Sequence, residues 1–203
     1  MTSTASNPRP NQFLGPAIGI TLWATAVIAA SQSGLLSALG RTFMPGFALL
    51  VALGIGVPVV LYFKWLSARS AVHAIGLHRL TLMHMWRIPA ALMFFWYGLR
   101  GELPPLFWIV AGVGDFLAGA LAATLLWREG TPSLYRRIHI FGFADFVTAV
   151  GLGLTFTLLD DPRMILLTTL PMALIPLFGV GLSGASHIIA LTRLTKLSAG
   201  TQH

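Results

Sequence analysis

Long apolar stretches dominate the chain, and short polar segments separate them. Six stretches of roughly 20 or more mainly apolar residues run over residues 13–36, 43–65, 80–99, 105–127, 138–159 and 166–192. A helix of about 20 residues is long enough to cross the hydrocarbon core of a bilayer. The stretches are continuously apolar rather than alternating, which favours membrane helices over the strands of a barrel. The pattern therefore predicts six transmembrane helices.

The rest of the chain leaves no room for a second domain. Residues 1–12 form a polar lead that we expect to be disordered, and it lacks the apolar core of a signal peptide. We assign residues 13–196 to a single transmembrane domain and residues 197–203 to a flexible cytoplasmic tail. Only 9% of the 203 residues are charged, against about 25% in soluble domains. The fold class predicted is an all-α integral membrane protein, a bundle of six helices.

Prolines mark the sixth apolar stretch as irregular. Pro171 and Pro176 both fall within it, and glycines follow them. A proline inside a helix removes a backbone donor and crowds the preceding turn. We therefore predict that this helix is bent or locally unwound. Two explanations stay open: proline is common in membrane helices in general, or the break exposes backbone carbonyls to a cavity, as in transporters.

Basic residues are distributed unevenly between the loops on the two sides of the predicted bundle. Nine of them lie at the two ends of the chain or in and beside loops 66–79 and 128–137, which belong to one side. Three lie in loops 37–42, 100–104 and 160–165, which belong to the other side. The nine are Arg9, Lys64, Arg69, Arg79, Arg128, Arg136, Arg137, Arg193 and Lys196. Cytoplasmic loops collect Lys and Arg, so both termini are predicted to be cytoplasmic in a bacterial inner membrane. The net charge of +7 then reflects topology and contact with anionic lipid, and no nucleic-acid partner is expected.

The motif Gly-x-x-Asp-Phe occurs twice inside apolar stretches. It reads GVGDF at residues 112–116 and GFADF at residues 142–146. Asp115 lies near the middle of its stretch and Asp145 lies well inside the next one. A charged side chain at the bilayer centre costs about 2.5–3.5 kcal/mol on the insertion scale. Both aspartates are therefore expected to face protein rather than lipid.

Small residues share a helix face with each aspartate and predict close helix packing. These packing candidates are Gly112, Gly119, Gly142 and Ala149. We predict that the fourth and fifth stretches pack against each other along this seam. The pattern leaves open whether the small faces meet within one chain or between chains. The expected partners are therefore the lipid bilayer and a second copy of the chain or another membrane subunit.

A buried cation in the third stretch completes the set of charges. Arg87 is seven residues in from Leu80, roughly 10 Å below the cytoplasmic boundary at a rise of about 1.5 Å per residue. Asp145 lies at a similar depth, and Asp115 roughly 5 Å deeper. We predict an Arg87–Asp145 ion pair with Asp115 close to both. One arginine and two ionised aspartates sum to −1, so we expect Asp115 to hold a proton or a cation to fill the site.

Two histidines and a threonine are candidate accessory residues. His84 precedes Arg87 by one helical turn, and His187 lies in the cytoplasmic half of the sixth stretch. Thr148 lies on the same predicted helix face as Asp145. Two histidines that face each other across a bundle are able to ligate a haem, which stays as an alternative. No other cofactor and no metal site is predicted, and the absence of cysteine excludes thiolate sites.

Two functional classes fit these residues, beside a purely architectural role. The first is a proton-coupled carrier or channel for an ion or small solute, with Asp115 and Asp145 as the proton or ion site and Arg87 as their charge partner. The second is an intramembrane enzyme, because GVGD at residues 112–115 resembles the G-x-G-D motif of intramembrane aspartyl proteases of the presenilin and prepilin-peptidase type. Those enzymes use two aspartates on facing helices to activate water. Here the motif comes first in the chain rather than second, and no tyrosine precedes Asp145.

The carrier is the interpretation that we favour, and the protease, a b-type haem protein and a structural membrane subunit are the alternatives.

Three runs of the sequence resemble a family of small uncharacterised bacterial multipass inner-membrane proteins. They are WRIPAALMFFWYGLRGELPPLFWIVAGVGDFLAGALA, HIFGFADFVTAVGLG and LIPLFGVGLSGASHIIALTRL. The resemblance covers the third to sixth predicted helices. It implies one compact membrane domain, and it implies no activity.

Overall fold

The structure is a computed structural model that describes residues 13–42 and 44–200, so the predicted polar lead lies outside the described residues. Helices joined by turns and short loops make up the described residues, and no strand occurs among them. The α-helices are α1 (Leu14–Gln32), α2 (Leu35–Thr42), α3 (Met44–Lys64), α4 (Leu66–Leu82), α5 (Arg87–Leu99), α6 (Pro105–Ala123), α7 (Pro132–Leu158) and α8 (Val180–Gly200). The irregular helical segments are η2 (Met83–Trp86), η3 (Pro162–Thr168) and η4 (Ile175–Gly179). Because α8 runs to Gly200, the first part of the predicted tail is helical.

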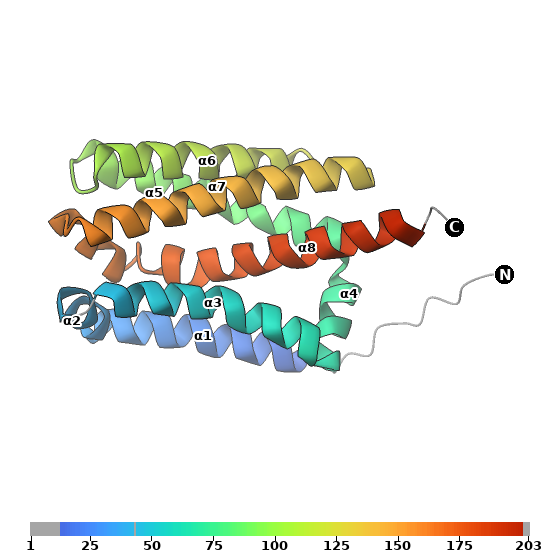
Figure 1. The fold of residues 1–203 in the computed structure, drawn as a ribbon, viewed down its shortest axis with the longest axis horizontal. Helices are drawn as coiled ribbons and strands as arrows, with labels where there is room; N and C mark the ends of the chain where they lie inside the picture. The colour runs from blue at the N-terminus through green and yellow to red at the C-terminus, as the bar shows by residue number, and fades with distance from the viewer. Residues whose placement is uncertain (1–12, 43, 201–203) are drawn as a thin grey trace.

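The helices lie side by side in one bundle (Figure 1). Helices α5, α6 and α7 form one side, α1 and α3 form the other, and α8 runs between them. Helix α4 crosses one end of the bundle and connects α3 to α5. Helix α1 begins, and α8 ends, at this same end of the molecule.

Five helices within the described residues are long and apolar enough to cross a membrane. These segments are Leu14–Gln32, Gly46–Lys64, Pro105–Ala123, Pro132–Leu158 and Ile175–Leu197. The predicted third span is not one continuous helix, because the 3₁₀ turn η2 separates α4 from the 13-residue helix α5. Pro89 explains the restart, since proline has no N–H to donate and is tolerated in the first turn of a helix.

Two segments that the hydrophobic pattern assigns to loops are helical. Residues 66–79 belong to α4, which is kinked at Gly76, where φ is 78°. Helix α7 begins at Pro132, several residues before the predicted boundary. The Thr131 side chain caps this helix by accepting a hydrogen bond from the backbone N–H of Leu134. Threonine at the cap followed by proline at the first position is a local start signal, and hydropathy does not detect it.

The break predicted in the sixth apolar stretch is confirmed. The chain forms the 3₁₀ segment η3, a turn region, and the π-helical segment η4 before α8 begins at Val180. Pro176 lies inside η4 and lacks the backbone donor that a regular helix requires there. Single π turns inside or beside α-helices are frequent at functional sites.

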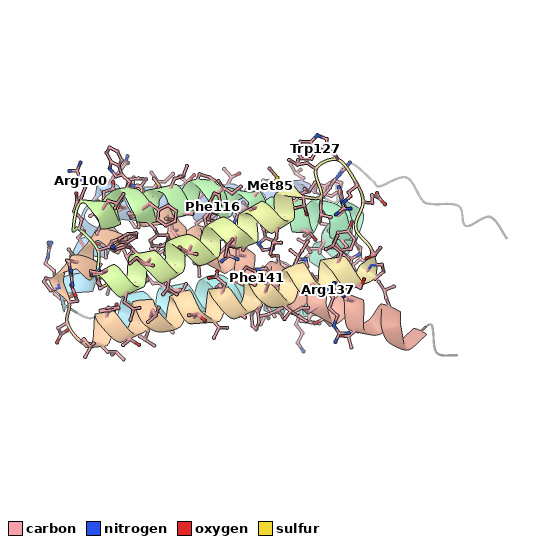
Figure 2. All side chains as sticks on the ribbon, turned by 90° about the horizontal axis from the view of Figure 1, so that it is seen from above. Met85, Arg100, Phe116, Trp127, Arg137 and Phe141 are labelled. Carbon is pink, nitrogen blue, oxygen red and sulfur yellow. The ribbon has the colours of Figure 1, made fainter. Side chains whose placement is uncertain are left out.

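Apolar side chains cover both the core and much of the outside of the bundle. The main core cluster joins α3, α5, α6, η3 and η4 and includes Phe94, Phe107 and Met172. Phe116 and Phe141 are exposed along the middle of α6 and α7, while Arg100 lies at one end of the bundle and Arg137 at the other (Figure 2). An apolar surface between charged ends is what a bilayer requires of a spanning bundle.

Candidate functional site

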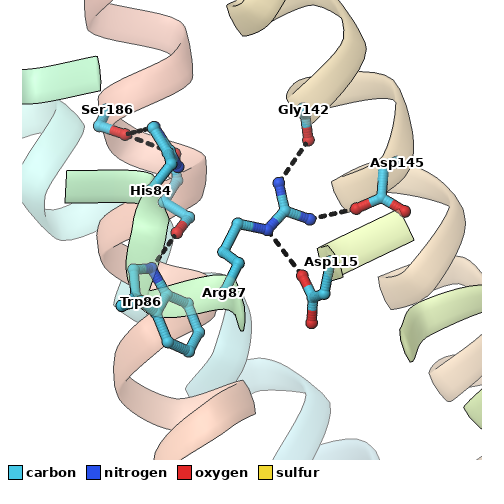
Figure 3. A network of polar contacts seen from close by, with 8 residues as sticks. His84, Trp86, Arg87, Asp115, Gly142, Asp145 and Ser186 are labelled. Atoms are coloured by element: carbon cyan, nitrogen blue, oxygen red, sulfur yellow. Dashed lines mark hydrogen bonds and ion pairs between the residues drawn. The ribbon is translucent and has the colours of Figure 1, made fainter. Parts of the chain in front are cut away.

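Arg87, the first residue of α5, contacts both aspartates of the repeated motif (Figure 3). Its Nε donates a hydrogen bond to Asp115 Oδ1 at 2.6 Å, and its Nη2 donates to Asp145 Oδ2. Its Nη1 donates to the backbone carbonyl of Gly142 at 3.3 Å. Arg87 is 3% exposed and Asp115 is 8% exposed. We call Arg87, Asp115 and Asp145 the charged cluster. Its arginine is shared between two carboxylates rather than paired with Asp145 alone.

The small face of α6 positions Asp115 by packing against α5. A Cβ atom added to Gly112 would lie 2.6 Å from Phe95 Cε1, and one added to Gly119 would lie 2.7 Å from Ile88 Cγ1. Both contacts are made with α5, so the predicted role of these glycines in a seam between α6 and α7 is wrong. The physical reason is that Asp115 shares their face, and its cation is on α5.

The contact between α6 and α7 uses a different glycine. A Cβ atom added to Gly114 would lie 1.6 Å from Asp145 Oδ1, so only a residue without a side chain fits against this carboxylate. Gly142 of α7 faces His187 of α8 instead, with an added Cβ 2.5 Å from its Cε1. Ala149 is partly buried and lines a cavity. Thus Gly142 does not face α6, whereas Ala149 packs against the core cluster that includes Phe107 and Ala111 of α6.

A mainly apolar cavity of about 270 Å³ reaches the charged cluster. Side chains from α3, α5, α6, α7, η4 and α8 line it, and its polar or charged lining residues include Arg87, Asp115, Ser183 and Thr157. The Nε1–H of Trp86, another lining residue, donates to Ser183 Oγ at 3.0 Å. An apolar cavity with a few convergent polar groups is the usual form of a small-molecule site.

Three histidines lie close together beside Gly142, the residue whose carbonyl accepts from Arg87. The rings of His84 and His187 are stacked with centroids 4.1 Å apart, and Nδ1 of His139 lies 2.9 Å from Nδ1 of His187. All three residues are buried. We call them the histidine cluster. His84 and His187 are predicted accessory residues, but His139 is not, because hydropathy assigns it to the edge of its span.

Thr148 does not reach the charged cluster. Its side chain is exposed, and its hydroxyl donates to the carbonyl of Ala144 one turn earlier in α7. This position gives no support to the predicted accessory role of Thr148, which stays a prediction. Helical periodicity places this residue only within a broad arc around Asp145, and the outer part of that arc faces away from the bundle.

Comparison with known protein families found a matching family model, which covers most of the chain. The model of the family described as Domain of unknown function (DUF8737) matches residues 44–195, which is well over half of the chain. The chain therefore belongs to this family. Comparisons with curated proteins and with solved structures found no match.

Proposed function

We propose that this member of the DUF8737 family spans a bacterial inner membrane six times, with both termini cytoplasmic. The sixth crossing is supplied by η2 together with α5, which runs alongside α6 (Figure 1). An even number of crossings agrees with the start of α1 and the end of α8 lying at one end of the bundle. Trp127 and Arg137 lie at this end, and Arg100 lies at the opposite one (Figure 2). The excess of basic residues at the former end favours its assignment to the cytoplasm.

We further propose that the protein is a proton-coupled carrier for a small amphipathic anion. The observation that carries this proposal is the apolar cavity that ends at Arg87 and Asp115. Arg87 is the only positively charged side chain among the described residues that line the cavity. An apolar body would occupy the cavity, and an anionic end would bind the guanidinium, which offers a planar set of donors.

The charge balance of the cluster provides the coupling step. One arginine and two ionised aspartates sum to −1, and a proton bound to Asp115 brings the sum to zero. A neutral carboxyl holds Arg87 less strongly than a carboxylate does, so the Nε of Arg87 becomes available to the anion. One proton and one monovalent anion then occupy the site together, and the transported pair carries no net charge.

The residues that line the cavity extend from the charged cluster toward one end of the bundle. Leu154 and Thr157, near the C-terminal end of α7, line the cavity, whereas His139 and the histidine cluster lie toward the N-terminal end. In the proposed topology, the cavity therefore lies on the non-cytoplasmic side of the charged cluster. Transport would require a second arrangement in which the cytoplasmic side opens, and the irregular segment η4 is positioned to permit that movement.

The alternative enzymes receive less support from this geometry. In an aspartyl protease two carboxyls share one proton and activate a water, whereas here both carboxylates accept hydrogen bonds from the same guanidinium. A haem iron would have to lie between two imidazoles. The rings of His84 and His187 instead contact each other directly, with 4.1 Å between centroids, which leaves no space for a macrocycle between them.

Uptake of p-toluenesulfonate into proteoliposomes tests the proposal. This compound has an apolar ring and a permanently anionic head, so it does not cross lipid unaided as a neutral acid. We expect uptake that increases when the source compartment is acidified, and no uptake of benzyltrimethylammonium, a cation of similar size. Asp115→Asn should remove the proton dependence of uptake.

A matched pair of substitutions in α7 separates the cavity from general damage to the fold. Ala149→Trp fills the cavity and should abolish uptake, whereas Ala144→Trp adds the same side chain at an exposed position of the same helix and should not. Equal uptake by wild type and Ala149→Trp would reject the cavity as the solute site. Uptake of the cation but not the anion would reject the assignment of Arg87.

A further inference from the structure

The histidine cluster contains ring nitrogens that no protein group satisfies. Nδ1 of His84 and Nε2 of His187 are buried and have no hydrogen-bond partner within the described part of the chain. A buried polar atom without a partner is uncommon and requires an explanation, such as a bound ion. One nitrogen from each of His84, His139 and His187 lies within 4.8 Å of the nitrogens of the other two.

The proton on His84 can be assigned from its partner. Its Nε2 is 2.9 Å from the hydroxyl oxygen of Ser186, and this hydroxyl is also 2.9 Å from the carbonyl oxygen of Ser183. A carbonyl can only accept, so the single hydroxyl proton goes to Ser183. Ser186 Oγ then accepts from Nε2–H of His84. The unpartnered Nδ1 of His84 is therefore the unprotonated nitrogen, with a free lone pair.

The same reasoning fixes His139. Thr81 Oγ1 donates to the carbonyl of Leu77 at 2.8 Å, and it lies 3.0 Å from Nε2 of His139. The ring nitrogen therefore donates to the threonine, and Nδ1 of His139 keeps its lone pair. This lone pair is directed at Nδ1 of His187, 2.9 Å away. A proton must lie between these two nitrogens, so Nδ1–H of His187 donates to His139. The lone pairs without a donor are therefore those of His84 Nδ1 and His187 Nε2, and a metal ion would displace the proton shared by His139 and His187.

We propose that His84, His139 and His187 bind a divalent first-row transition metal ion of the kind that neutral imidazole prefers, for which Zn²⁺ is the test ion. Metal-binding histidines characteristically donate their second ring N–H to an oxygen acceptor, as His84 and His139 do here. Two ligands 2.0–2.1 Å from a tetrahedral Zn²⁺ are on the order of 3.3 Å apart. The present spacings bracket this value, since the Nδ1 atoms of His139 and His187 are 2.9 Å apart and the candidate ligand nitrogens all lie within 4.8 Å of one another.

Two neighbouring features are compatible with a cation at this position. Gly142 has no side chain, and this allows His187 to lie against α7, since an added Cβ would be 2.8 Å from its Nε2. The charged cluster, which contacts the carbonyl of Gly142 through Arg87, carries one excess negative charge when both aspartates are ionised.

Three protein ligands leave a fourth position of a tetrahedral ion open, which is the pattern of catalytic rather than structural zinc sites.

Metal titration of the full-length protein in detergent tests the proposal. The protein is stripped with a chelator and titrated with Co²⁺, whose visible absorption reports tetrahedral coordination, and then with Zn²⁺ in competition. We expect one ion per chain. His139→Ala should weaken Zn²⁺ binding by more than about 100-fold, and His78→Ala should leave it unchanged. His78 is the matched control because it bonds to Tyr135 outside the cluster.

A second variant keeps the test decisive if His139→Ala does not fold. Thr81→Val retains all three histidines and the approximate shape of residue 81, but it removes the acceptor that orients His139. We expect Zn²⁺ affinity to fall by about 10–100-fold. Folded wild-type protein that shows no saturable binding of Co²⁺ or Zn²⁺ would overturn the proposal. Binding that is equally strong in wild type and Thr81→Val would overturn it as well.

Discussion

The charged cluster and the histidine cluster are neighbours that differ in how completely their polar groups are satisfied. In the charged cluster, each terminal nitrogen of Arg87 and its Nε donates to an acceptor from α6 or α7. In the histidine cluster, two buried ring nitrogens have no partner among the described residues. The first region is charged and saturated, and the second is neutral and unsaturated.

This difference follows from the energetic cost of burying charge. An unpaired ion within a bilayer costs several kcal/mol, so Arg87 and the two aspartates must contact compensating groups. A neutral imidazole has a much smaller desolvation cost, and its position is decided by local packing and available acceptors. The fold therefore gives each nitrogen of the Arg87 guanidinium an acceptor, while it tolerates free lone pairs in the histidine cluster.

Arg87→Ala is expected to have the largest effect, because it breaks the saturated region. The substitution leaves two buried carboxylates without their cation and should lower the free energy of unfolding by about 3–5 kcal/mol. Thermal unfolding in detergent measures this loss. The triple variant Arg87→Leu, Asp115→Leu, Asp145→Leu removes all three charges and should recover much of the stability. A triple variant as unstable as Arg87→Ala would show that the loss comes from packing rather than charge.

The same cost explains why the charged cluster could be anticipated from sequence. Three ions within apolar stretches at similar depths have few partners other than each other, so Arg87, Asp115 and Asp145 were expected to be close. The partition of Arg87 between both carboxylates was not predictable, because depth along a helix does not determine which face meets which neighbour. For that reason Gly112 and Gly119 were assigned to the wrong helix pair.

Gly114→Ala is expected to disturb the charged cluster alone. The added Cβ would fall 1.6 Å from Asp145 Oδ1 and must displace that carboxylate from Arg87. Overpacking of this kind costs about 1–3 kcal/mol. Gly151→Ala is the control, because a Cβ at this position of α7 meets nothing within 4 Å. Equal melting temperatures of the two variants would contradict the close approach of α6 to Asp145.

Ser186→Ala is the corresponding change in the histidine cluster. It removes the oxygen that accepts from His84 Nε2–H, so a third ring nitrogen of the cluster loses its partner. An unsatisfied buried donor costs about 1–3 kcal/mol, and a neutral ring lies toward the lower end of that range. Thermal unfolding with and without a metal chelator measures the change. A loss as large as that of Arg87→Ala would show that the two clusters do not differ in the proposed way.

Hydropathy predicted most of the helical segments but missed those that local chemistry starts or stops. Helix α7 starts at a cap formed by Thr131 and Pro132, and the third predicted span is interrupted at η2. Both features depend on backbone hydrogen-bond donors and acceptors, which hydropathy does not detect. His139 was missed for a related reason. It lies in the additional turns at the start of α7 that hydropathy treated as the edge of a loop, so its contact with His187 was not considered.

The smallest effect is expected for the ion pair of Asp161 and Arg163, in the connection between α7 and η3. This pair is a reference for an arginine–carboxylate contact outside the long apolar helices. The Arg163 side chain donates to Asp161 through Nε at 2.9 Å and Nη2 at 2.5 Å, and this holds the pKa of Asp161 below its usual range. A carboxyl whose pKa is lower in the folded state stabilises the fold above its unfolded pKa of about 3.9. This contribution is lost as the pH falls through the lower, folded pKa.

Asp161→Asn keeps an oxygen that accepts from the Arg163 backbone N–H but removes the charge. At pH 7 the melting temperature of this variant should therefore be lower than that of the wild type by less than about 4 °C. The difference from wild type should shrink as the pH is lowered toward 3. A decrease at pH 7 as large as that of Arg87→Ala would mean that burial adds nothing to the strength of the charged cluster, and the contrast between the saturated cluster and ordinary surface pairs would fail.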